Sequence, residues 1–266
     1  MEYTEITSRQ NATLKHLARL AREKKYRLTT GEMVCEGEKM LYEAISSGIK
    51  IKTILLRSDS VLGAAALELL IKAQAQGAAL FVVEEKLFAL ASDVEAAQWL
   101  IFSCVRPVQQ TVDFSKVRRA VLLDGLQDPG NLGTILRTAD AFALDLVILC
   151  EGCTDPTAPK VVRATMGAAF RQKVCQMPLA EAIDALHYEK IPVYAAALET
   201  DSVPIPVEGF PIRAAVIVGN EGNGVTQSAL TLCDEKVLIP MAGCAESLTA
   251  GVAAAILIWE LIKIGG

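Results

Sequence analysis

The sequence lacks the features of an exported or membrane-spanning chain. Its N-terminus opens with the acids Glu2 and Glu5 rather than with a basic region and an apolar core, so we expect no secretory signal. The apolar run at 248–264 is shorter than the roughly 20 residues that a bilayer requires. It also contains Glu260 and Lys263, so a buried helix without contact to a membrane is predicted there.

Paired cysteines and clusters of metal ligands are also missing. The seven cysteines are odd in number and scattered, which excludes a disulfide framework and favours a reducing, cytoplasmic compartment. Cys150 and Cys153 form a lone CxxC without a second pair and without a histidine at ligand spacing. Two buried thiols are therefore expected there, and no metal.

The composition indicates a folded chain with one local excess of positive charge. With 266 residues, 52% of them apolar, the chain suits one large or two modest domains. A net charge of −5 argues against a protein that coats nucleic acid with its whole surface. In residues 9–27, however, one acid accompanies His16 and a set of cations, namely Arg9, Lys15, Arg19, Arg22, Lys24, Lys25 and Arg27. This stretch is either a solvated helix face or a patch that follows phosphates.

The first hundred residues predict a small α/β unit. Apolar residues with helical spacing beneath the basic side chains predict one amphipathic helix over 8–28. Further helices are expected at 38–47 and 64–76, and strands at 51–56, 79–83 and 100–105. Residues 106–116 are polar and irregular, as is typical of a linker, so we predict domains at 1–105 and 117–266.

Beyond the linker, strand and helix patterns alternate. Strands are expected at 119–123, 145–149, 173–176, 191–197, 214–218 and 236–239, with helices between most of them. This order favours an α/β fold with a largely parallel sheet, whose ligands bind outside the carboxyl ends of the strands. Three loops rich in special backbone residues, 128–133, 218–224 and 239–248, each follow such a strand and suggest one shared site.

The polar side chains in these loops have structural as well as functional interpretations. Asn131 stands at a predicted N-cap, and Arg137 lies on the polar stripe of the next helix, three residues before Asp140. Capping and a solvated ion pair explain both residues. For Glu221, a hydrogen-bonding or acid/base role and plain exposure are equally open. The small residues at 249–255 suit core or dimer packing as well as the approach of a ligand.

Taken in order, the loops resemble the three motifs of a known family. The segments are NLGTILRTADAF at 131–142, IVGNEG at 217–222, IPMAG at 239–243 and ESL at 246–248. They resemble the SpoU (TrmH) family of RNA ribose 2'-O-methyltransferases. The first hundred residues are similar to the family's L30e-like substrate-binding domain, with ITSRQN at 6–11 and CEGE at 35–38. The resemblance implies a SPOUT-like domain with a deep trefoil knot, which binds S-adenosylmethionine and forms a homodimer.

The resemblance also implies a set of site residues. The cofactor-binding residues would be Gly219, Ile239, Met241 and Leu248, and the catalytic residues Arg137, Asn131, Glu221 and Ser247. The resemblance implies that Arg137, with help from RNA phosphate, activates the ribose hydroxyl. Because a guanidinium is practically never deprotonated, we favour a role in which Arg137 binds phosphate and stabilises negative charge on the ribose oxygen. Where the family usually has asparagine two residues after the motif-three serine, this chain has Thr249, which lacks the amide donors.

The resulting hypothesis is 2'-O-methylation of a ribose in structured RNA, with ribosomal RNA favoured over transfer RNA by the L30e-like domain. In this hypothesis, phosphate is contacted by Arg9, Lys15, Arg22, Lys24, Lys25 and Arg27. A non-catalytic RNA-binding or ribosome assembly factor with the same fold is a second interpretation. A third, an ordinary Rossmann enzyme that uses NAD, is disfavoured because the GxGxxG fingerprint after the first strand is missing.

Overall fold

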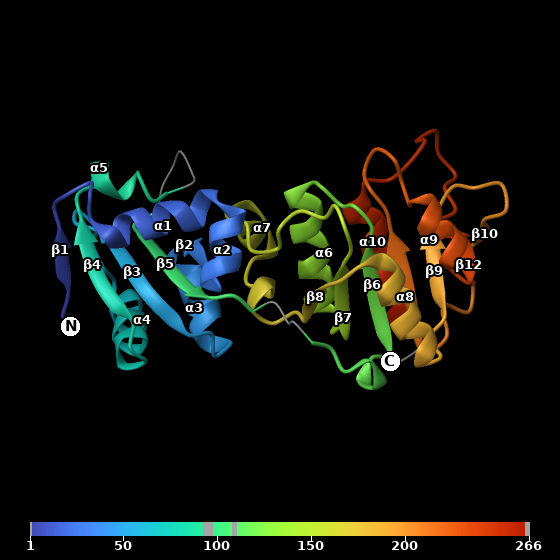
Figure 1. Cartoon of the computed structure of the whole chain (residues 1–266), viewed down its shortest axis with the longest axis horizontal. Helices are drawn as coiled ribbons and strands as arrows, with labels where there is room; N and C mark the ends of the chain where they lie inside the picture. The colour runs from blue at the N-terminus through green and yellow to red at the C-terminus, as the bar shows by residue number, and fades with distance from the viewer. Residues whose placement is uncertain (1, 93–97, 108–110, 264–266) are drawn as a thin grey trace. The chain divides into compact units, whose positions relative to one another are not determined.

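The computed structural model describes residues 2–92, 98–107 and 111–263. The chain divides into two compact units (Figure 1). The first comprises Met1–Pro107 together with Thr157–Phe170, and the second comprises Val108–Pro156 together with Arg171–Gly266. Residues 108–110 of the predicted linker lie outside the described residues.

A mixed sheet organises the first unit. Its described strands are β1 (Thr4–Ile6), β2 (Glu32–Glu36), β3 (Ile51–Arg57), β4 (Ala79–Val83) and β5 (Leu100–Val105), in the order β1-β4-β3-β5-β2. Helices α3 (Glu38–Ser46) and α4 (Ala64–Ala75) share one apolar core with the sheet. Helices α1 (Ala12–Arg22) and α5 (Glu85–Phe88) share another. Both faces of the sheet are therefore covered by helices.

The basic stretch forms two helices rather than the single helix predicted over 8–28. Helix α1 ends at Arg22, and α2 (Lys24–Thr30) begins after Glu23, whose backbone is extended with φ −108° and ψ 103°. The buried guanidinium of Arg27 donates through Nη1 to the carbonyl oxygens of Leu20 at 2.7 Å and Ala21 at 3.5 Å. These carbonyls belong to the last turn of α1. The Arg27 side chain therefore supplies the donors that backbone N–H groups would supply in a longer helix.

Residues 157–170 pack with the first unit, although they follow two strands of the second. This segment contains α7 (Pro159–Thr165) and the 3-10 turn η2 (Ala168–Phe170). Val162, Ala169 and Phe170 belong to the same core as Met33 and Met40. The structure therefore differs from the predicted continuous domain 117–266, because these apolar side chains are buried in the first unit.

The second unit contains a parallel sheet, as the alternating pattern predicts. Its described strands are β6 (Arg119–Leu123), β7 (Leu146–Leu149), β8 (Val174–Gln176), β9 (Val193–Ala196), β10 (Val203–Pro204), β11 (Ala214–Val218) and β12 (Glu235–Leu238). Their order is β10-β12-β9-β11-β6-β7-β8, and every recorded pair is parallel. The chain runs from β6 outward to β7 and β8 and later returns to β11 on the other side of β6. Such a reversal opens a crevice at the carboxyl ends of the strands.

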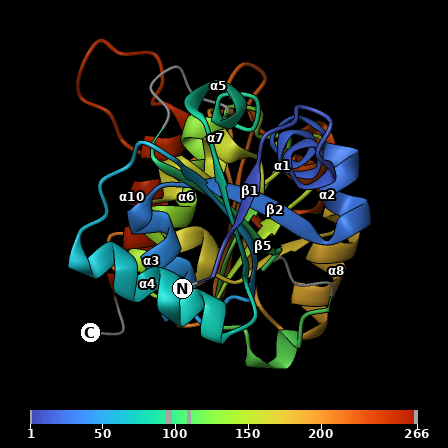
Figure 2. The same ribbon diagram turned by 90° about the vertical axis from the view of Figure 1, so that its left-hand side faces the viewer.

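Helices cover both faces of this sheet. Helices α6 (Pro129–Ala141) and α10 (Ala250–Ile262) pack against each other, and α10 also contacts β6 and β11. Helices α8 (Leu179–Tyr188) and α9 (Gln227–Leu232) bury their apolar side chains in a core with β6, β7, β9 and β11. Figure 2 shows α6 and α10 on one side and α8 on the other. Within the described residues, no helix is both long and apolar enough to cross a membrane.

Candidate active site

A cavity of about 390 Å³ lies at the carboxyl edge of the second sheet. The loops after β9, β11 and β12 line it, together with the start of α10. The lining includes all four residues predicted to bind the cofactor, Gly219, Ile239, Met241 and Leu248, and two of the predicted catalytic residues, Glu221 and Ser247. Its volume falls within the range of about 300–1,000 Å³ that is usual for small-molecule sites.

The loop after β11 is a closed turn that requires glycine at its start. The N–H of Asn220 donates to the Gly224 carbonyl at 2.8 Å, and the N–H of Gly224 donates to the Asn220 carbonyl at 2.9 Å. A Cβ on Gly219 would lie 2.1 Å from the Gly224 carbonyl carbon. Gly224 itself has a φ of +67°. The tight turn therefore exists, and it requires glycine at position 219 because a Cβ there would overlap the backbone of Gly224.

The carboxylate of Glu221 joins this loop to the loop after β6. It accepts hydrogen bonds from the N–H groups of Gln127 at 3.2 Å and Asp128 at 2.9 Å, and from Nδ2 of Asn131 at 3.1 Å. The Asn220 side chain adds a second link, from Nδ2 to the Gly125 carbonyl at 2.8 Å. The two loops, 94 residues apart between Gln127 and Glu221, are thus held side by side.

These hydrogen bonds determine the charge of Glu221. Partial burial raises its pKa, but the hydrogen bonds from Asn131 and from the Asp128 and Gln127 backbone outweigh that effect, so the pKa lies below its usual value. The carboxylate is therefore ionised at neutral pH and is a weak proton acceptor there. Its contribution to stability is present above the usual carboxyl pKa and is lost as the pH falls through the lowered value.

Asn131 is not the N-cap of α6, contrary to the sequence prediction. The N-cap is Asp128, whose Oδ1 accepts the backbone N–H of Asn131 at 2.7 Å, and Pro129 occupies the first turn, where its fixed φ suits a helix start. The Asn131 amide is consequently free to bind Glu221. A Cβ on Gly251 would lie 3.0 Å from Asn131 Oδ1, so the small residue in α10 makes room for this side chain.

Arg137 is exposed on α6 and does not line the cavity. Its expected partner Asp140 instead binds Arg171, with Nη2 and Oδ2 2.9 Å apart. In the described part of the chain, the side chain of Arg137 makes no hydrogen bond or ion pair. Arg137 is therefore a solvated arginine that does not pair with Asp140, and its guanidinium is available to a ligand.

Thr249 is the N-cap of α10. Its hydroxyl accepts a hydrogen bond from the Val252 N–H at 3.4 Å. Threonine and asparagine are both favoured at this position, so the substitution of the family's usual asparagine conserves the cap.

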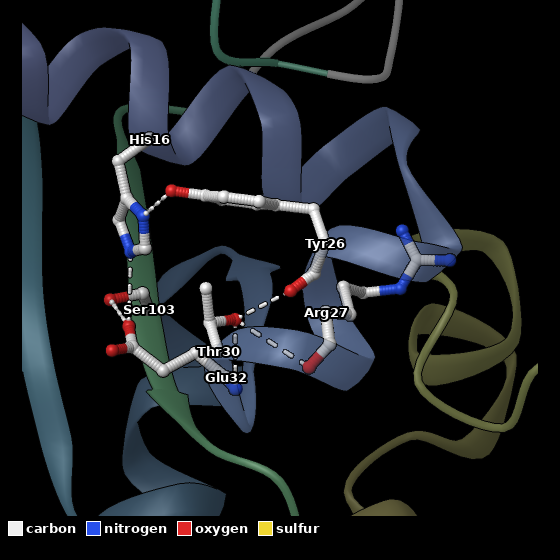
Figure 3. A network of polar contacts seen from close by, with 6 residues as sticks. All are labelled: His16, Tyr26, Arg27, Thr30, Glu32 and Ser103. Atoms are coloured by element: carbon white, nitrogen blue, oxygen red, sulfur yellow. Dashed lines mark hydrogen bonds and ion pairs between the residues drawn. The ribbon is translucent and has the colours of Figure 1, made fainter.

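Figure 3 shows how part of the basic stretch is fixed to the first sheet. His16 Nδ1 lies 2.9 Å from the Tyr26 hydroxyl, and His16 Nε2 lies 3.1 Å from Glu32 Oε2, which also accepts the Ser103 hydroxyl at 3.1 Å. The network connects α1, α2, β2 and β5. No pattern in the sequence pointed to it, because its members are far apart in the chain.

The cations of the basic stretch differ in what they contact. Arg27 is only 4% exposed, and in Figure 3 its side chain points away from the network. Its predicted contact with RNA is therefore wrong, because its guanidinium binds carbonyls of α1. Arg19 lies 3.8 Å over the Tyr26 ring and pairs with Glu23. The other predicted RNA-binding cations, Arg9, Lys15, Arg22, Lys24 and Lys25, are exposed. Of these, Lys15 donates to Gln10 Oε1 and Arg22 donates to the Leu90 carbonyl at 3.1 Å.

Cys150 and Cys153 are both buried thiols. Cys153 Sγ donates to the Leu123 carbonyl at 3.0 Å. Burial raises the pKa of each thiol, so both are protonated at neutral pH. Within residues 2–92, 98–107 and 111–263, no group of three or more metal-ligating side chains is present.

Family models match both units of the chain. The model of the SpoU rRNA methylase family matches residues 118–259, and the model of the MRM3-like substrate binding domain matches residues 11–101. The chain belongs to the SpoU rRNA methylase family.

Individual relatives agree with this assignment over nearly the full length. The 23S rRNA (guanosine(2553)-2'-O)-methyltransferase RlmP of Bacillus subtilis is 34% identical over 259 residues, which are 97% of this chain and 98% of the relative. The 23S rRNA (uridine(2479)-2'-O)-methyltransferase of Streptomyces viridochromogenes is 28% identical and covers 97% and 91%. The crystal structure of an rRNA methyltransferase from Sinorhizobium meliloti with bound AdoMet (S-adenosylmethionine) has a TM-score of 0.85 and 28% identity, and it covers 99% of both chains.

Proposed function

We propose that this protein transfers a methyl group from S-adenosylmethionine to a ribose 2'-oxygen in ribosomal RNA. The observation that carries the proposal is the cavity lined by the second and third family loops, where Glu221 at the edge binds Asn131 of the first. Ribosomal RNA is favoured over transfer RNA by the match of the first unit to a substrate binding domain and by relatives that modify 23S rRNA. Because those two relatives modify different nucleotides, the target nucleotide does not carry over to this chain.

The cavity suits S-adenosylmethionine in size and in the chemistry of its wall. Ala196, Ala197, Val218 and Leu248 supply apolar surface for a flat ring, and Gly219 contributes backbone to the wall. In this proposal, Gly219, Ile239, Met241 and Leu248 hold the cofactor, which supplies a methyl group already activated on a sulfonium. The protein then has to align the ribose oxygen, stabilise its charge and let the hydroxyl proton pass to solvent water.

The polar residues divide these tasks between them. Arg137 binds an RNA phosphate and stabilises negative charge that develops on the 2'-oxygen. Asn131, held by Glu221, orients the ribose, and Ser247 contributes a hydroxyl at the cavity wall. Glu221 acts by positioning Asn131 and the loop after β6, since a carboxylate with a lowered pKa is a poor base at neutral pH.

We further propose that the second unit contains a trefoil knot and forms a homodimer through α6 and α10. After β12, near one edge of the sheet, the chain returns past the ends of β9 and β11 to place α10 against β11 and β6, and this return supports the proposal of a knot. Half of the Trp259 surface is exposed on α10, beside Phe142 at a ring distance of 5.4 Å. An exposed tryptophan beside a partly buried phenylalanine favours an interface. The seven free cysteines support a reducing, cytoplasmic location.

Incubation with methyl-labelled S-adenosylmethionine is expected to label ribosomal RNA and to leave transfer RNA unlabelled. Nuclease digestion of the product should release a 2'-O-methylated nucleoside, because the proposed acceptor is the ribose oxygen. Calorimetry with S-adenosylmethionine alone should show one site per chain. Cofactor binding without labelling of any RNA would contradict the methyltransferase, and absence of cofactor binding would favour a non-catalytic RNA-binding or assembly factor.

Replacing Lys24 and Lys25 with alanine is expected to reduce the dependence of RNA binding on salt. Both side chains are exposed, and each phosphate contact that is lost should lower the slope of log K against log salt by about 0.7–0.9. The slope is measured by fluorescence anisotropy with an rRNA fragment between low and physiological salt. Lys72→Ala is the matched control, because Lys72 lies in the same unit but pairs with Glu68 at 2.7 Å. Equal slopes for the wild type and the double variant would refute the contact.

A further inference from the structure

Asp140 lies where it would compete for the guanidinium of Arg137. It follows Arg137 by three residues on α6, and side chains at this spacing are neighbours on a helix surface. Asp140 also stands in the last turn of α6, where the helix dipole is unfavourable to a carboxylate and increases its attraction for a cation. Without another partner, Asp140 would draw Arg137 toward the end of the helix.

Arg171 supplies that other partner from outside the helix. Its Nε lies 3.3 Å from Oδ1 and 3.2 Å from Oδ2 of Asp140, and its Nη2 lies 2.9 Å from Oδ2. The Asp140 side chain is 23% exposed, so the pair is partly shielded from solvent. The forked guanidinium of Arg171 thus binds both carboxylate oxygens of Asp140, and it neutralises the negative charge that would otherwise attract Arg137.

The backbone beside Arg171 is anchored near the end of α6. Gln172 is buried, and its Nε2 donates to the carbonyl of Leu144 at 3.1 Å, three residues beyond the last residue of α6. The Val147 N–H donates to the Lys173 carbonyl at 3.0 Å. Arg171 is therefore held next to Asp140 by its neighbours in the chain, in addition to its own ion pair.

We infer that Arg171 is a positioning residue that keeps Arg137 available to RNA by binding Asp140. The inference rests on the role of Arg137 in the proposed function. It assigns no contact with substrate or cofactor to Arg171. The observed contacts agree with this role, because Asp140 binds Arg171 and Arg137 has no ion pair among the described residues.

The test is the rescue of an Arg171 variant by a change at Asp140. Arg171→Gln removes the cation and frees Asp140 to capture Arg137, so kcat for methyl transfer to an rRNA fragment should fall about three- to tenfold. The Kd for S-adenosylmethionine should not change, because neither Arg171 nor Asp140 lines the cavity. Asp140→Asn alone should keep wild-type activity, and the double variant Arg171→Gln/Asp140→Asn should recover the activity of Asp140→Asn.

Two further variants keep the result interpretable. Arg171→Lys, which retains a cation at Asp140 and is the milder change, should keep at least half of the activity. Loss of activity in the double variant equal to that in Arg171→Gln, or equal loss in Arg171→Lys, would overturn the inference, because either result means that Arg171 acts on RNA or on folding directly. Full activity of Arg137→Ala would instead refute the proposed role of Arg137. An inactive Arg137→Ala beside a fully active Arg171→Gln would refute only the inference about Arg171.

Discussion

Arg137→Ala is expected to slow methyl transfer by about a hundredfold or more, which is the usual effect of removing a group that stabilises developing negative charge. The affinity for S-adenosylmethionine should stay unchanged, because Arg137 is exposed on α6 and does not line the cavity. The loss should therefore appear in kcat and in the affinity for RNA. Single-turnover rates with labelled cofactor, combined with calorimetry, separate these contributions.

Arg118→Ala is the matched control for this experiment. Arg118 is an exposed arginine of the same unit, but it precedes β6 and so lies at the amino edge of the sheet, opposite the cavity. Its replacement should change the rate by less than about twofold, since surface substitutions away from a site have small effects. Arg137→Lys should recover only part of the activity, because lysine keeps the charge but loses the planar fork that binds phosphate in a bidentate manner. Wild-type rates for Arg137→Ala would remove Arg137 from the proposed mechanism.

Gly219→Ala is expected to abolish measurable binding of S-adenosylmethionine and to destabilise the second unit. The new methyl group would lie 2.1 Å from the Gly224 carbonyl carbon and 2.3 Å from the Val225 nitrogen. Both are backbone atoms, so the clash cannot be relieved by rotating a side chain and the whole turn must move. Overpacking of this kind costs about 1–3 kcal/mol or more. The measurements are calorimetry with the cofactor and thermal unfolding.

Gly222→Ala provides a control in the same loop. A Cβ there would meet Asn220 Oδ1 at 3.6 Å, which is an ordinary contact, and Gly222 does not have a positive φ. Cofactor affinity and unfolding temperature should therefore stay near the wild-type values. Tight cofactor binding by Gly219→Ala, or equal losses in both variants, would contradict the assignment of the turn at Gly219 to the cofactor site.

Local patterns predicted the elements that hold the site. The strands expected at 119–123 and 214–218 coincide with β6 and β11, since buried parallel strands are short apolar runs that need no distant information to be recognised. The family loops follow β6, β11 and β12, and residues from the loops after β11 and β12 line the cavity. The N-cap was misplaced, because Asp128 and Asn131 are both good capping residues and only the path of the backbone distinguishes them.

Other misassignments came from contacts over longer distances. In the sequence, Arg27 is one more cation of a basic stretch. In the structure it is buried, because its guanidinium binds carbonyl oxygens of the preceding helix. The segment 157–170 lies between strands of the parallel sheet in sequence, but its apolar side chains complete the core of the first unit. Periodicity predicts which side chains are buried, but it does not predict which of the two units buries them.

By itself, the sequence determined the α/β class, the parallel sheet, the family and the residues that gather at one edge of that sheet. These depend on short-range spacing and on the residue types within each loop, and both are visible along the chain. Only the tertiary structure decided that Glu221 binds Asn131, that Thr249 caps α10 and that Asp140 pairs with Arg171 rather than with Arg137. The reason is physical: a hydrogen bond or an ion pair goes to whichever partner the folded backbone brings within about 3 Å, and that partner need not be near in sequence.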